Sequence, residues 1–393
     1  MRQEGEQVTT CYITDAIRSP VGALGGTLAS KPAFALAGEL IRHWQSFGVL
    51  DSDSVDQVIL GNVLQSGQGM NPARQAAVLG GLPYTVPAYT VNAVCASGLQ
   101  SIVLGAQAIK LGEAQTIVAG GMENMSRTPH ALLGSRSGKR LGHEELTDLM
   151  ILDGLWDAFY SCHMASTVES LARRMGITRD EQDKLAVCSH ERAVEARQSG
   201  TLETEIVPIE TDSGCVSQDE RPRADTTFEK LAGLEPAFAN DGTITAGNAS
   251  GINDGAAILK LTADRPHGDM RLCFEVVSSE LVAVDPGDMG IAPVYAIRKL
   301  LSRLDLRIED IGLWEINEAF AAQIIAVQRQ LEVSWDRLNV KGGAVAIGHP
   351  VGCSGARILV SLVHEMLRRN TEHGVASVCV GGGLGLALLV RQL

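Results

Sequence analysis

Short apolar runs alternate with longer helical patterns along most of the chain. The runs at 12–14, 57–60, 116–120 and 377–380 have the length and apolar character of buried strands. From Leu99, apolar residues recur with the spacing of one helix face, at Ile102, Val103, Ala106 and Ile109. This helix is rich in small residues, so we expect it to lie inside the protein. Alternating strands and helices of this kind predict an α/β fold.

A weak internal repeat divides the chain into two similar halves. In the first half, a cysteine-containing turn at 95–98 precedes a helix and a strand that ends in two glycines. In the second half, a turn at 353–355 precedes a helix at 356–369 and a strand that ends in three glycines. The segments 56–62 and 310–317, which come earlier in each half, also resemble each other. Because both matches occur in the same order, they favour a duplicated α/β domain.

Between the two halves the pattern changes, which predicts an insertion that covers one end of the core. A polar helix is expected near 178–199, and an irregular run of acidic and basic residues follows at 210–230. The expected domains are 1–124 together with 252–274 for the first half, 125–251 for the inserted loop domain, and 275–393 for the second half.

Composition and charge narrow the class of protein. The chain has 393 residues, 45% of them hydrophobic and 20% charged, which is typical of a globular protein. Its net charge of −13 argues against a nucleic-acid partner. We expect no membrane span, no signal peptide in the polar stretch 1–6 and no peroxisomal signal in the last three residues, Arg391, Gln392 and Leu393. A cytoplasmic enzyme is therefore the expectation.

The eight cysteines are scattered without metal-ligand spacing, so we expect reduced thiols and no metal site. Cys95 precedes a helix, whose oriented N–H groups are expected to lower the pKa of the thiol and make it a nucleophile. Cys379 ends an apolar strand before three glycines, whose N–H groups can stabilise an oxyanion. The alternative for each is a small buried side chain that packs a turn or the core.

Two further side chains complete the set of candidate catalytic residues. His349 lies among glycines and apolar residues and has a side chain suited to proton transfer near neutrality. The alternative is a histidine whose hydrogen bonds are satisfied within its loop. Asn317 follows the apolar run 313–316, where its amide can hold a water or a substrate carbonyl, or else cap the helix that follows.

Four segments, in this order along the chain, resemble the active-site blocks of the thiolase family. They are 91–98 with Cys95, 317–320 with Asn317, 348–350 with His349, and 379–383 with Cys379. The resemblance covers the whole chain. It implies an α/β fold with a duplicated five-layered core (α-β-α-β-α) and an inserted loop domain, in agreement with the repeat and the insertion described above.

The resemblance also implies a role for each candidate catalytic residue. Cys95 is the nucleophile that carries an acyl group as a thioester, and His349 activates it. His349 and a water held by Asn317 form one oxyanion hole, and the backbone N–H groups of Cys95 and Gly381 form the other. Cys379 exchanges the proton on the α-carbon of acetyl-CoA.

Coenzyme A thioesters are the implied substrates, and no cofactor is expected. Arg221, Arg223, Lys230 and the cluster at 136–140 offer local positive charge for the coenzyme A anion. The residues implied to line the path of coenzyme A are Arg223, Lys230, Ala246 and Ser250, with Leu155 nearby. Those implied to line the acyl pocket are His163, Met164, Met289, Ala319 and Phe320. The cluster Arg136, Lys139 and Arg140 is implied to belong to a loop that assembles a homotetramer, the alternative being a solvated charged surface.

The block around His163 and Met164 resembles the biosynthetic branch of the family, which condenses two acetyl-CoA into acetoacetyl-CoA and CoA. Ala165 and Ser166 depart from the residues common in that block, and Ala93 and Ala96 depart from those common beside the nucleophile. Three alternatives remain, namely a degradative 3-ketoacyl-CoA thiolase for longer chains, a non-catalytic acyl-CoA binder and, less favoured, a decarboxylating ketoacyl synthase.

Overall fold

The first half of the chain builds a mixed sheet of five strands. The computed structural model describes residues 9–265 and 272–393, so the N-terminal stretch 1–6 lies outside the described residues, as does part of the expected segment 252–274. The strands are β1 (Tyr12–Arg18), β3 (Gln57–Gly61), β4 (Ala88–Val91), β5 (Thr116–Asn124) and β12 (Asn253–Thr262), in the order β1-β12-β5-β3-β4. β3 is parallel to β4 and β5, whereas β12 is antiparallel to both β5 and β1.

The second half repeats this topology. Its strands are β13 (Phe274–Ala283), β14 (Leu313–Ile316), β15 (His373–Val380) and β16 (Leu384–Gln392), in the order β13-β16-β15-β14. β14 is parallel to β15, β16 is antiparallel to β15 and β13, and a parallel bridge between Trp314 and Leu338 takes the place of the fifth strand. A short antiparallel pairing of β1 with β13 joins the two sheets. The expected duplication is therefore confirmed.

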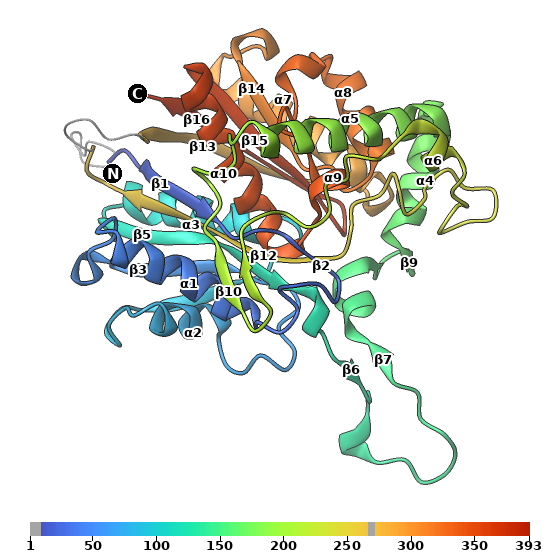
Figure 1. Cartoon of the computed structure of the whole chain (residues 1–393), viewed down its shortest axis with the longest axis horizontal. Helices are drawn as coiled ribbons and strands as arrows, with labels where there is room; N and C mark the ends of the chain where they lie inside the picture. Colours follow the sequence, from blue (N-terminus) through green and yellow to red (C-terminus); the bar gives the residue numbers. More distant parts are fainter. Residues whose placement is uncertain (1–8, 266–271) are drawn as a thin grey trace, which may run out of the picture.

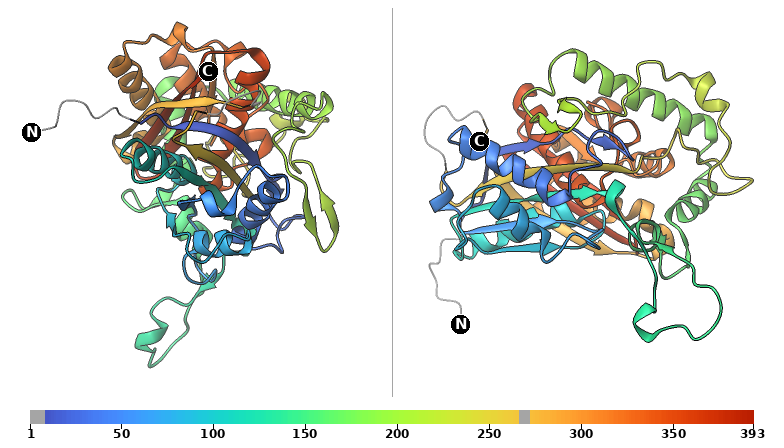
Figure 2. Two further views of the ribbon diagram at one scale, coloured as in Figure 1. Left: turned by 90° about the vertical axis from the view of Figure 1, so that its left-hand side faces the viewer. Right: turned by 60° about the horizontal axis from the view of Figure 1, so that its bottom comes forward.

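Helices cover both sheets and fill the space between them, as Figures 1 and 2 show. The outer helices are α1 (Ala33–Ser46) and α2 (Pro72–Leu79) on the first sheet, and α7 (Ala292–Leu304) and α8 (Ala321–Leu331) on the second. The helices α3 (Ser97–Lys110) and α10 (Val351–Arg369) lie between the sheets. These five layers confirm the expected α-β-α-β-α core.

The strands are continuously apolar because both of their faces are buried. Successive side chains of a strand point to opposite faces, so neighbours enter different cores. In β5, Ile117 and Ala119 pack in the core between the two sheets, whereas Val118 packs in the core beneath α1 and α2. In β16, Leu388 lies in the central core and Leu389 in the core beneath α7 and α8.

The helix expected at 356–369 begins five residues earlier, at Val351. The turn expected at 353–355 is therefore wrong, and these residues form the first turns of α10. The physical reason is the close crossing of α3 and α10, which only small residues permit. A Cβ on Gly98 would lie 2.9 Å from the nitrogen of Ala356 and from the oxygen of Gly352.

The chain between β5 and β12 holds the segment that we expected to be inserted. It contains α4 (Met164–Met175), α5 (Arg179–Gln198) and α6 (Phe228–Ala232), together with the short hairpins β6–β7 (His130–Ala131 with Thr147–Asp148), β8–β9 (Trp156–Asp157 with Cys162–His163) and β10–β11 (Ile209–Thr211 with Gly214–Val216). α5 matches the polar helix expected near 178–199, and Thr178 and Glu181 form its capping box. The β6–β7 hairpin projects from the rest of the molecule (Figure 1).

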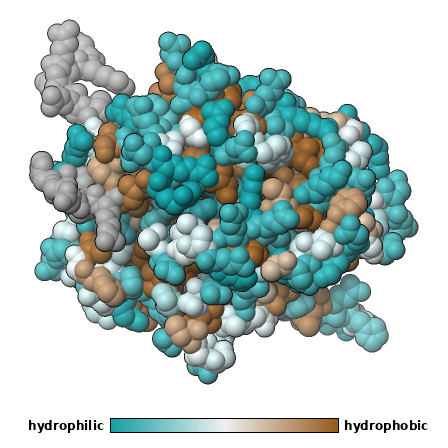
Figure 3. Space-filling view, turned by 45° about the horizontal axis from the view of Figure 1, so that its top comes forward, coloured by the Kyte–Doolittle hydropathy of each residue, from teal (hydrophilic) through white to brown (hydrophobic). Residues whose placement is uncertain are grey.

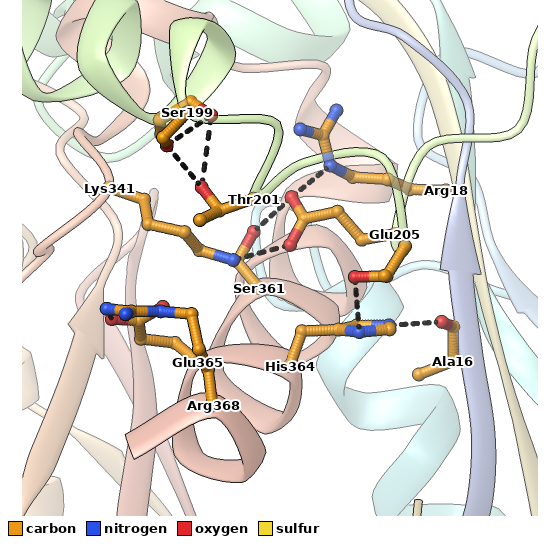
Figure 4. A network of polar contacts seen from close by, with 12 residues as sticks. Ala16, Arg18, Ser199, Thr201, Glu205, Lys341, Ser361, His364, Glu365 and Arg368 are labelled. Carbon is orange, nitrogen blue, oxygen red and sulfur yellow. Dashed lines mark hydrogen bonds and ion pairs between the residues drawn. The ribbon is translucent and has the colours of Figure 1, made fainter. Parts of the chain in front are cut away.

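A buried ionic network fastens this segment to both halves of the core (Figure 4). Arg18 of β1 donates to the carboxylates of Glu205 and Asp219, at 2.9 Å and 2.7 Å. Lys341 of the second half lies 2.6 Å from the other oxygen of Glu205. Burial opposes the charge of Glu205, but Lys341 and Arg18 still hold the pKa of this carboxyl below its usual range. The network therefore keeps Glu205 ionised inside the protein.

The molecular surface carries both hydrophilic and apolar residues. On the face drawn in Figure 3, hydrophilic residues predominate and apolar residues are scattered between them. Within the described ranges, every helix is too short or too polar to cross a lipid bilayer.

Candidate active site

Cys95 lies in a tight loop between β4 and α3. The residue before it, Val94, has a φ of 49°, in the left-handed region that a β-branched residue rarely adopts. The hydroxyl of Ser97 holds this loop, since it donates to the oxygen of Val94 at 2.6 Å and accepts from the N–H of Ala93 at 2.9 Å. A strained residue that its surroundings hold in place is characteristic of functional sites.

His349 lies in the loop between α9 (Ala344–Ile347) and α10. Its N–H donates to the side-chain oxygen of Asn253 and to the backbone oxygen of Gly251, at 3.1 Å and 3.3 Å. Gly348 has a φ of 115°, and a Cβ there would lie 2.3 Å from the side chain of Asn253. Only glycine therefore allows the backbone to place His349 in this position.

Ser354 determines which ring nitrogen of His349 carries the proton. Its Oγ lies 2.9 Å from the oxygen of Pro350, which can only accept a hydrogen bond, and 2.5 Å from Nδ1 of His349. The single hydroxyl proton goes to Pro350, so Oγ accepts from the Nδ1–H of His349. The buried Nε2, which has no hydrogen-bond partner among the described residues, then keeps its lone pair. His349 is therefore arranged to accept a proton at Nε2.

Asn317 lies beside His349 but does not cap a helix. Its N–H donates to the oxygen of Ser377 at 2.9 Å, and its Nδ2 is 3.4 Å from Nδ1 of His349. Phe320, three residues later, occupies the N-cap position of α8. The N-cap alternative for Asn317 is therefore wrong, because the helix begins only at Ala321. Oδ1 of Asn317 is buried without a partner in the described part of the chain.

Cys379 is the second-last residue of β15, and Gly381, Gly382 and Gly383 form the turn into β16. Its side chain is only 1% exposed. A Cβ at position 381 would lie 2.6 Å from the methyl carbon of Met164, so this flexible side chain packs against the turn. The turn therefore brings a pocket residue of the inserted segment directly onto the backbone beside Cys379.

Burial controls the protonation of both thiols. It raises the pKa of Cys95 to about 11, although the backbone N–H groups of Gly381 and of Cys95 itself act in the opposite direction. It also raises the pKa of Cys379 above its ordinary value, and the proximity of Cys95 adds to this effect. The expected lowering of the Cys95 pKa is therefore wrong, because removal of the thiol from water outweighs the oriented amides at the start of α3.

His349 is neutral for the same reason. Burial, followed by the positive charge of Arg357, lowers the pKa of His349 to about 4. Arg357 lies two helical turns into α10 and is itself buried. A neutral imidazole and two protonated thiols therefore make up the resting site near pH 7. Such a site transfers protons between neighbouring groups rather than storing a thiolate.

One cavity of about 380 Å³ brings the candidate residues together. Cys95, His349, Cys379 and Gly381 line it, whereas Asn317 lies behind His349. All but two of the residues expected to bind substrate line it as well, namely Leu155, His163, Met164, Ala246, Ser250, Met289, Ala319 and Phe320. Residues that are more than 200 positions apart in the chain therefore meet at one end of the duplicated core.

Arg223 and Lys230 do not line this cavity. Arg223 is exposed, and Lys230 forms an ion pair with Asp225 at 2.7 Å while its side chain remains 59% exposed. The chain segment that carries Arg223 and Lys230 lies outside the cavity, and Arg221, two residues before Arg223, lines the cavity instead. Arg221 was expected only as one of three basic residues that lie close together in this segment, and nothing in the residue pattern distinguished it from Arg223 and Lys230.

The sequence analysis also missed Phe238. The rings of Phe238 and His163 stack with their centroids 4.6 Å apart. Nδ1 of His163 accepts from the N–H of Ala165 at 3.1 Å, which leaves Nε2 as the protonated nitrogen, and burial lowers the pKa of this imidazole. His163 therefore offers a neutral donor on the cavity wall. No sequence signal singled out Phe238, because its contact crosses 75 positions of chain.

Comparisons with known proteins identify the family of the chain. Residues 11–264 match the model of the thiolase N-terminal domain, and residues 270–392 match that of the thiolase C-terminal domain. An acetyl-CoA acetyltransferase of Pseudomonas aeruginosa is 49% identical over 389 residues, which cover 97% of this chain and 98% of that protein. A probable acetyl-CoA acyltransferase of Staphylococcus aureus is 47% identical and covers 98% of this chain and 100% of its own length.

A solved structure shows the same similarity in three dimensions. The crystal structure of the Bacillus anthracis acetyl-CoA acetyltransferase superposes with a TM-score of 0.95 at 44% identity, over 99% of this chain and 100% of that one. Both domain models and the full-length relatives thus agree with the duplicated fold and with the four sequence blocks. The chain belongs to the thiolase family.

Proposed function

We propose that the protein is an acetyl-CoA C-acetyltransferase, which reversibly converts two acetyl-CoA into acetoacetyl-CoA and CoA. The observation that carries the proposal is the meeting of the thiols of Cys95 and Cys379 and a neutral imidazole in one cavity. The names of the relatives from P. aeruginosa and B. anthracis support the acetyl group as the unit transferred. The reaction requires no cofactor, since coenzyme A thioesters are the substrates.

The first half-reaction transfers an acetyl group to the enzyme. Cys95 gives its proton to Nε2 of His349 as the sulfur attacks the thioester carbonyl. The bond from the carbonyl carbon to the Cys95 sulfur forms, the bond to the CoA sulfur breaks, and CoA leaves with the proton of Cys379. A Cys379 thiolate and a protonated His349 remain beside the acetylated Cys95. The N–H groups of Cys95 and Gly381, which both act on the Cys95 sulfur, are suited to stabilise the oxyanion.

The second half-reaction forms the carbon–carbon bond. The Cys379 thiolate left by the first half-reaction takes the α-proton from a second acetyl-CoA, and the resulting enolate attacks the acetyl group on Cys95. The bond to the Cys95 sulfur breaks, acetoacetyl-CoA forms, and His349 returns its proton to the Cys95 thiolate, so that all three groups regain their resting state. In this step we assign the second oxyanion hole to His349 and to a water held by Asn317. In the cleavage direction, the high pKa of Cys379 keeps it protonated and ready to donate.

The walls of the cavity favour a short acyl chain. His163 and Met164 come from the inserted segment and Met289 comes from the second half, and all three line the cavity. Met164 packs against the turn at Gly381, and His163 is fixed by Phe238. Side chains held in this way have little freedom to move aside for a long chain.

A series of 3-ketoacyl-CoA substrates tests both the nucleophile and the pocket. Thiolysis rates are measured from C4 to C16, and the acyl-enzyme is detected by intact mass. We expect the highest kcat/KM at C4 and an acetyl adduct that the Cys95→Ser variant does not form. Cys162→Ser, which changes a thiol that does not line the cavity, is the matched control and should still be acetylated.

Two outcomes would contradict the proposal. A preference for long chains would identify a degradative thiolase. The absence of any adduct on the wild-type protein would indicate a non-catalytic acyl-CoA binder.

We also propose a cytoplasmic homotetramer. The projecting β6–β7 hairpin carries the exposed charges Arg136, Lys139 and Arg140 beside exposed leucines, of which Leu133 and Leu141 are 57% and 86% exposed. Apolar side chains of this kind favour burial against another subunit. Light scattering should give four times the chain mass, and deletion of the hairpin tip should reduce it.

A further inference from the structure

Arg221 is a charged residue in the active-site cavity for which the reaction steps above have no use. It is the one permanently charged side chain among the described residues that line the cavity. Its Nε is buried and has no hydrogen-bond partner in the described ranges 9–265 and 272–393. Burial, followed by repulsion from Arg223, lowers the pKa of the guanidinium. A cation held in this way is costly unless a ligand completes its hydrogen bonds.

The neighbouring carboxylates do not compensate Arg221. Asp219 is paired with Arg18 and accepts from the N–H of Val21 at 2.8 Å. Glu220 accepts from the N–H groups of Ala23 and Thr27, at 2.5 Å and 3.0 Å. These contacts attach the loop to the turn after β2 (Gly22–Ala23) and direct the two acidic side chains away from the cavity. Arg221 is therefore held in place without a counter-ion among the residues that the structure describes.

The guanidinium lies close to the backbone that carries the catalytic histidine. A Cβ on Gly251 would be 2.4 Å from Cζ of Arg221, so the guanidinium packs directly on this glycine. The oxygen of Gly251 in turn accepts from the N–H of His349 at 3.3 Å. Ser250, the residue before it, also lines the cavity. Arg221 is thus placed along the approach to the thiols and not at the outer surface.

We propose that Arg221 binds an amide carbonyl of the pantetheine arm of coenzyme A and thereby selects for substrates that carry this arm. The inference rests on the proposed function, which requires the arm to enter the cavity for its thioester to reach Cys95. The arm offers two amide carbonyls, and a guanidinium donates strongly to such oxygens. The phosphates of coenzyme A are strongly hydrated and fit the exposed Arg223 and Lys230 better than a recessed, largely apolar wall.

The test compares three acetyl donors on the Arg221→Met variant. They are acetyl-CoA, acetyl-pantetheine and S-ethyl thioacetate, which lacks the arm. Second-order rate constants for acetylation of Cys95 are followed by intact mass. We expect Arg221→Met to lower the rate constants for acetyl-CoA and acetyl-pantetheine by about 10- to 100-fold, which is the effect of losing a hydrogen bond to a charged group. The rate constant for S-ethyl thioacetate should remain unchanged.

Arg221→Lys keeps the charge and should lose less activity. Arg197→Met is the matched control, because Arg197 is also partly buried but lines a separate cavity of about 290 Å³. It should leave all three constants unchanged. Melting temperatures of the variants report any loss of structure.

Three results would overturn the inference. A loss confined to acetyl-CoA would assign Arg221 to the phosphates, an equal loss with all three donors would indicate a structural role, and no loss would show that it binds nothing.

Calorimetry separates this inference from the proposed function. If none of the donors acetylates wild-type Cys95, the proposed function fails, but the binding of CoA is still measurable. Arg221→Met should then weaken CoA about 10- to 100-fold and leave adenosine 3′,5′-bisphosphate, which lacks the arm, unchanged. Unchanged binding of CoA would overturn the inference whatever the activity.

Discussion

Ser354 provides a direct test of how the structure prepares His349. Its Oγ accepts the Nδ1 proton of His349 at 2.5 Å and thereby fixes the tautomer that leaves Nε2 free to take a proton. The change Ser354→Ala removes this acceptor without adding volume. The buried Nδ1–H then has only the amide of Asn317 beside it, whose Nδ2 is a donor 3.4 Å away.

The size of the effect follows from the cost of an unpaired buried donor, about 1–3 kcal/mol. With about 1.4 kcal/mol for each factor of ten in rate, this corresponds to a loss of about 5- to 150-fold if the whole cost falls on the reactive tautomer. The loss should appear in the rate of Cys95 acetylation and in kcat. KM should change little, because Ser354 does not line the cavity.

The assay is steady-state thiolysis of acetoacetyl-CoA together with the rate of acetyl-enzyme formation. Ser101→Ala is the control, since Ser101 is a buried helix serine whose Oγ lies within hydrogen-bonding distance of the oxygens of Gly98 and Gly120 and does not touch His349. It should lower the melting temperature but leave kcat near the wild-type value. A Ser354→Ala enzyme with unchanged kcat, or one that loses activity only through KM, would refute the assignment of the tautomer.

Four further predictions concern pH, charge and packing. Burial and Arg357 lower the pKa of His349 to about 4, so His349 stays neutral above that pH. We therefore expect kcat/KM to be constant from pH 8 to about pH 5. A fall in kcat/KM on the acid side near pH 6.5, the ordinary histidine pKa, would contradict this. Arg18→Met should lower the free energy of unfolding by about 3–5 kcal/mol in denaturant titrations, because it leaves the buried Glu205 without one of its partners. A loss below about 1 kcal/mol would show that the network contributes little to stability. The pKa of Glu205 is below its ordinary value, so its stabilising contribution should be full above about pH 5 and fall as the solution is acidified; stability that rises on acidification would contradict this. Gly98→Ala should cost about 1–3 kcal/mol by the same titrations, because its Cβ would lie 2.9 Å from the backbone of α10, and an unchanged midpoint would show that the crossing is loose.

Much of the fold could be predicted from local patterns. Apolar runs of strand length became β1, β3, β5, β14 and β15, since strands buried on both faces are apolar throughout. The polar helix near 178–199 became α5 because Thr178 and Glu181 provide a local start signal. The beginning of α10 was missed because the segment 353–355 resembles a turn, whereas Gly355 lacks a side chain because a Cβ there would lie 2.7 Å from the nitrogen of Leu99 in α3.

Only part of the candidate site could be predicted from the sequence. Cys95, His349 and Cys379 stand out in glycine-rich segments, and the structure brings them to one cavity. Phe238 was missed, and Arg221 was not distinguished from Arg223 and Lys230, because the direction of a side chain in an irregular segment depends on contacts made far away in the chain. For Arg221 these contacts include the bonds of Glu220 to the turn near Ala23.

The sequence by itself determined the elements, their duplication and the identity of the reactive groups, since these depend on residue type and spacing. Only the tertiary structure decided the protonation of those groups. A helix start is expected to lower the pKa of Cys95, yet burial raises it to about 11, and a neutral His349 follows from burial and from Arg357. The physical reason is that desolvation depends on every element packed around a group, and no local stretch of sequence contains that information.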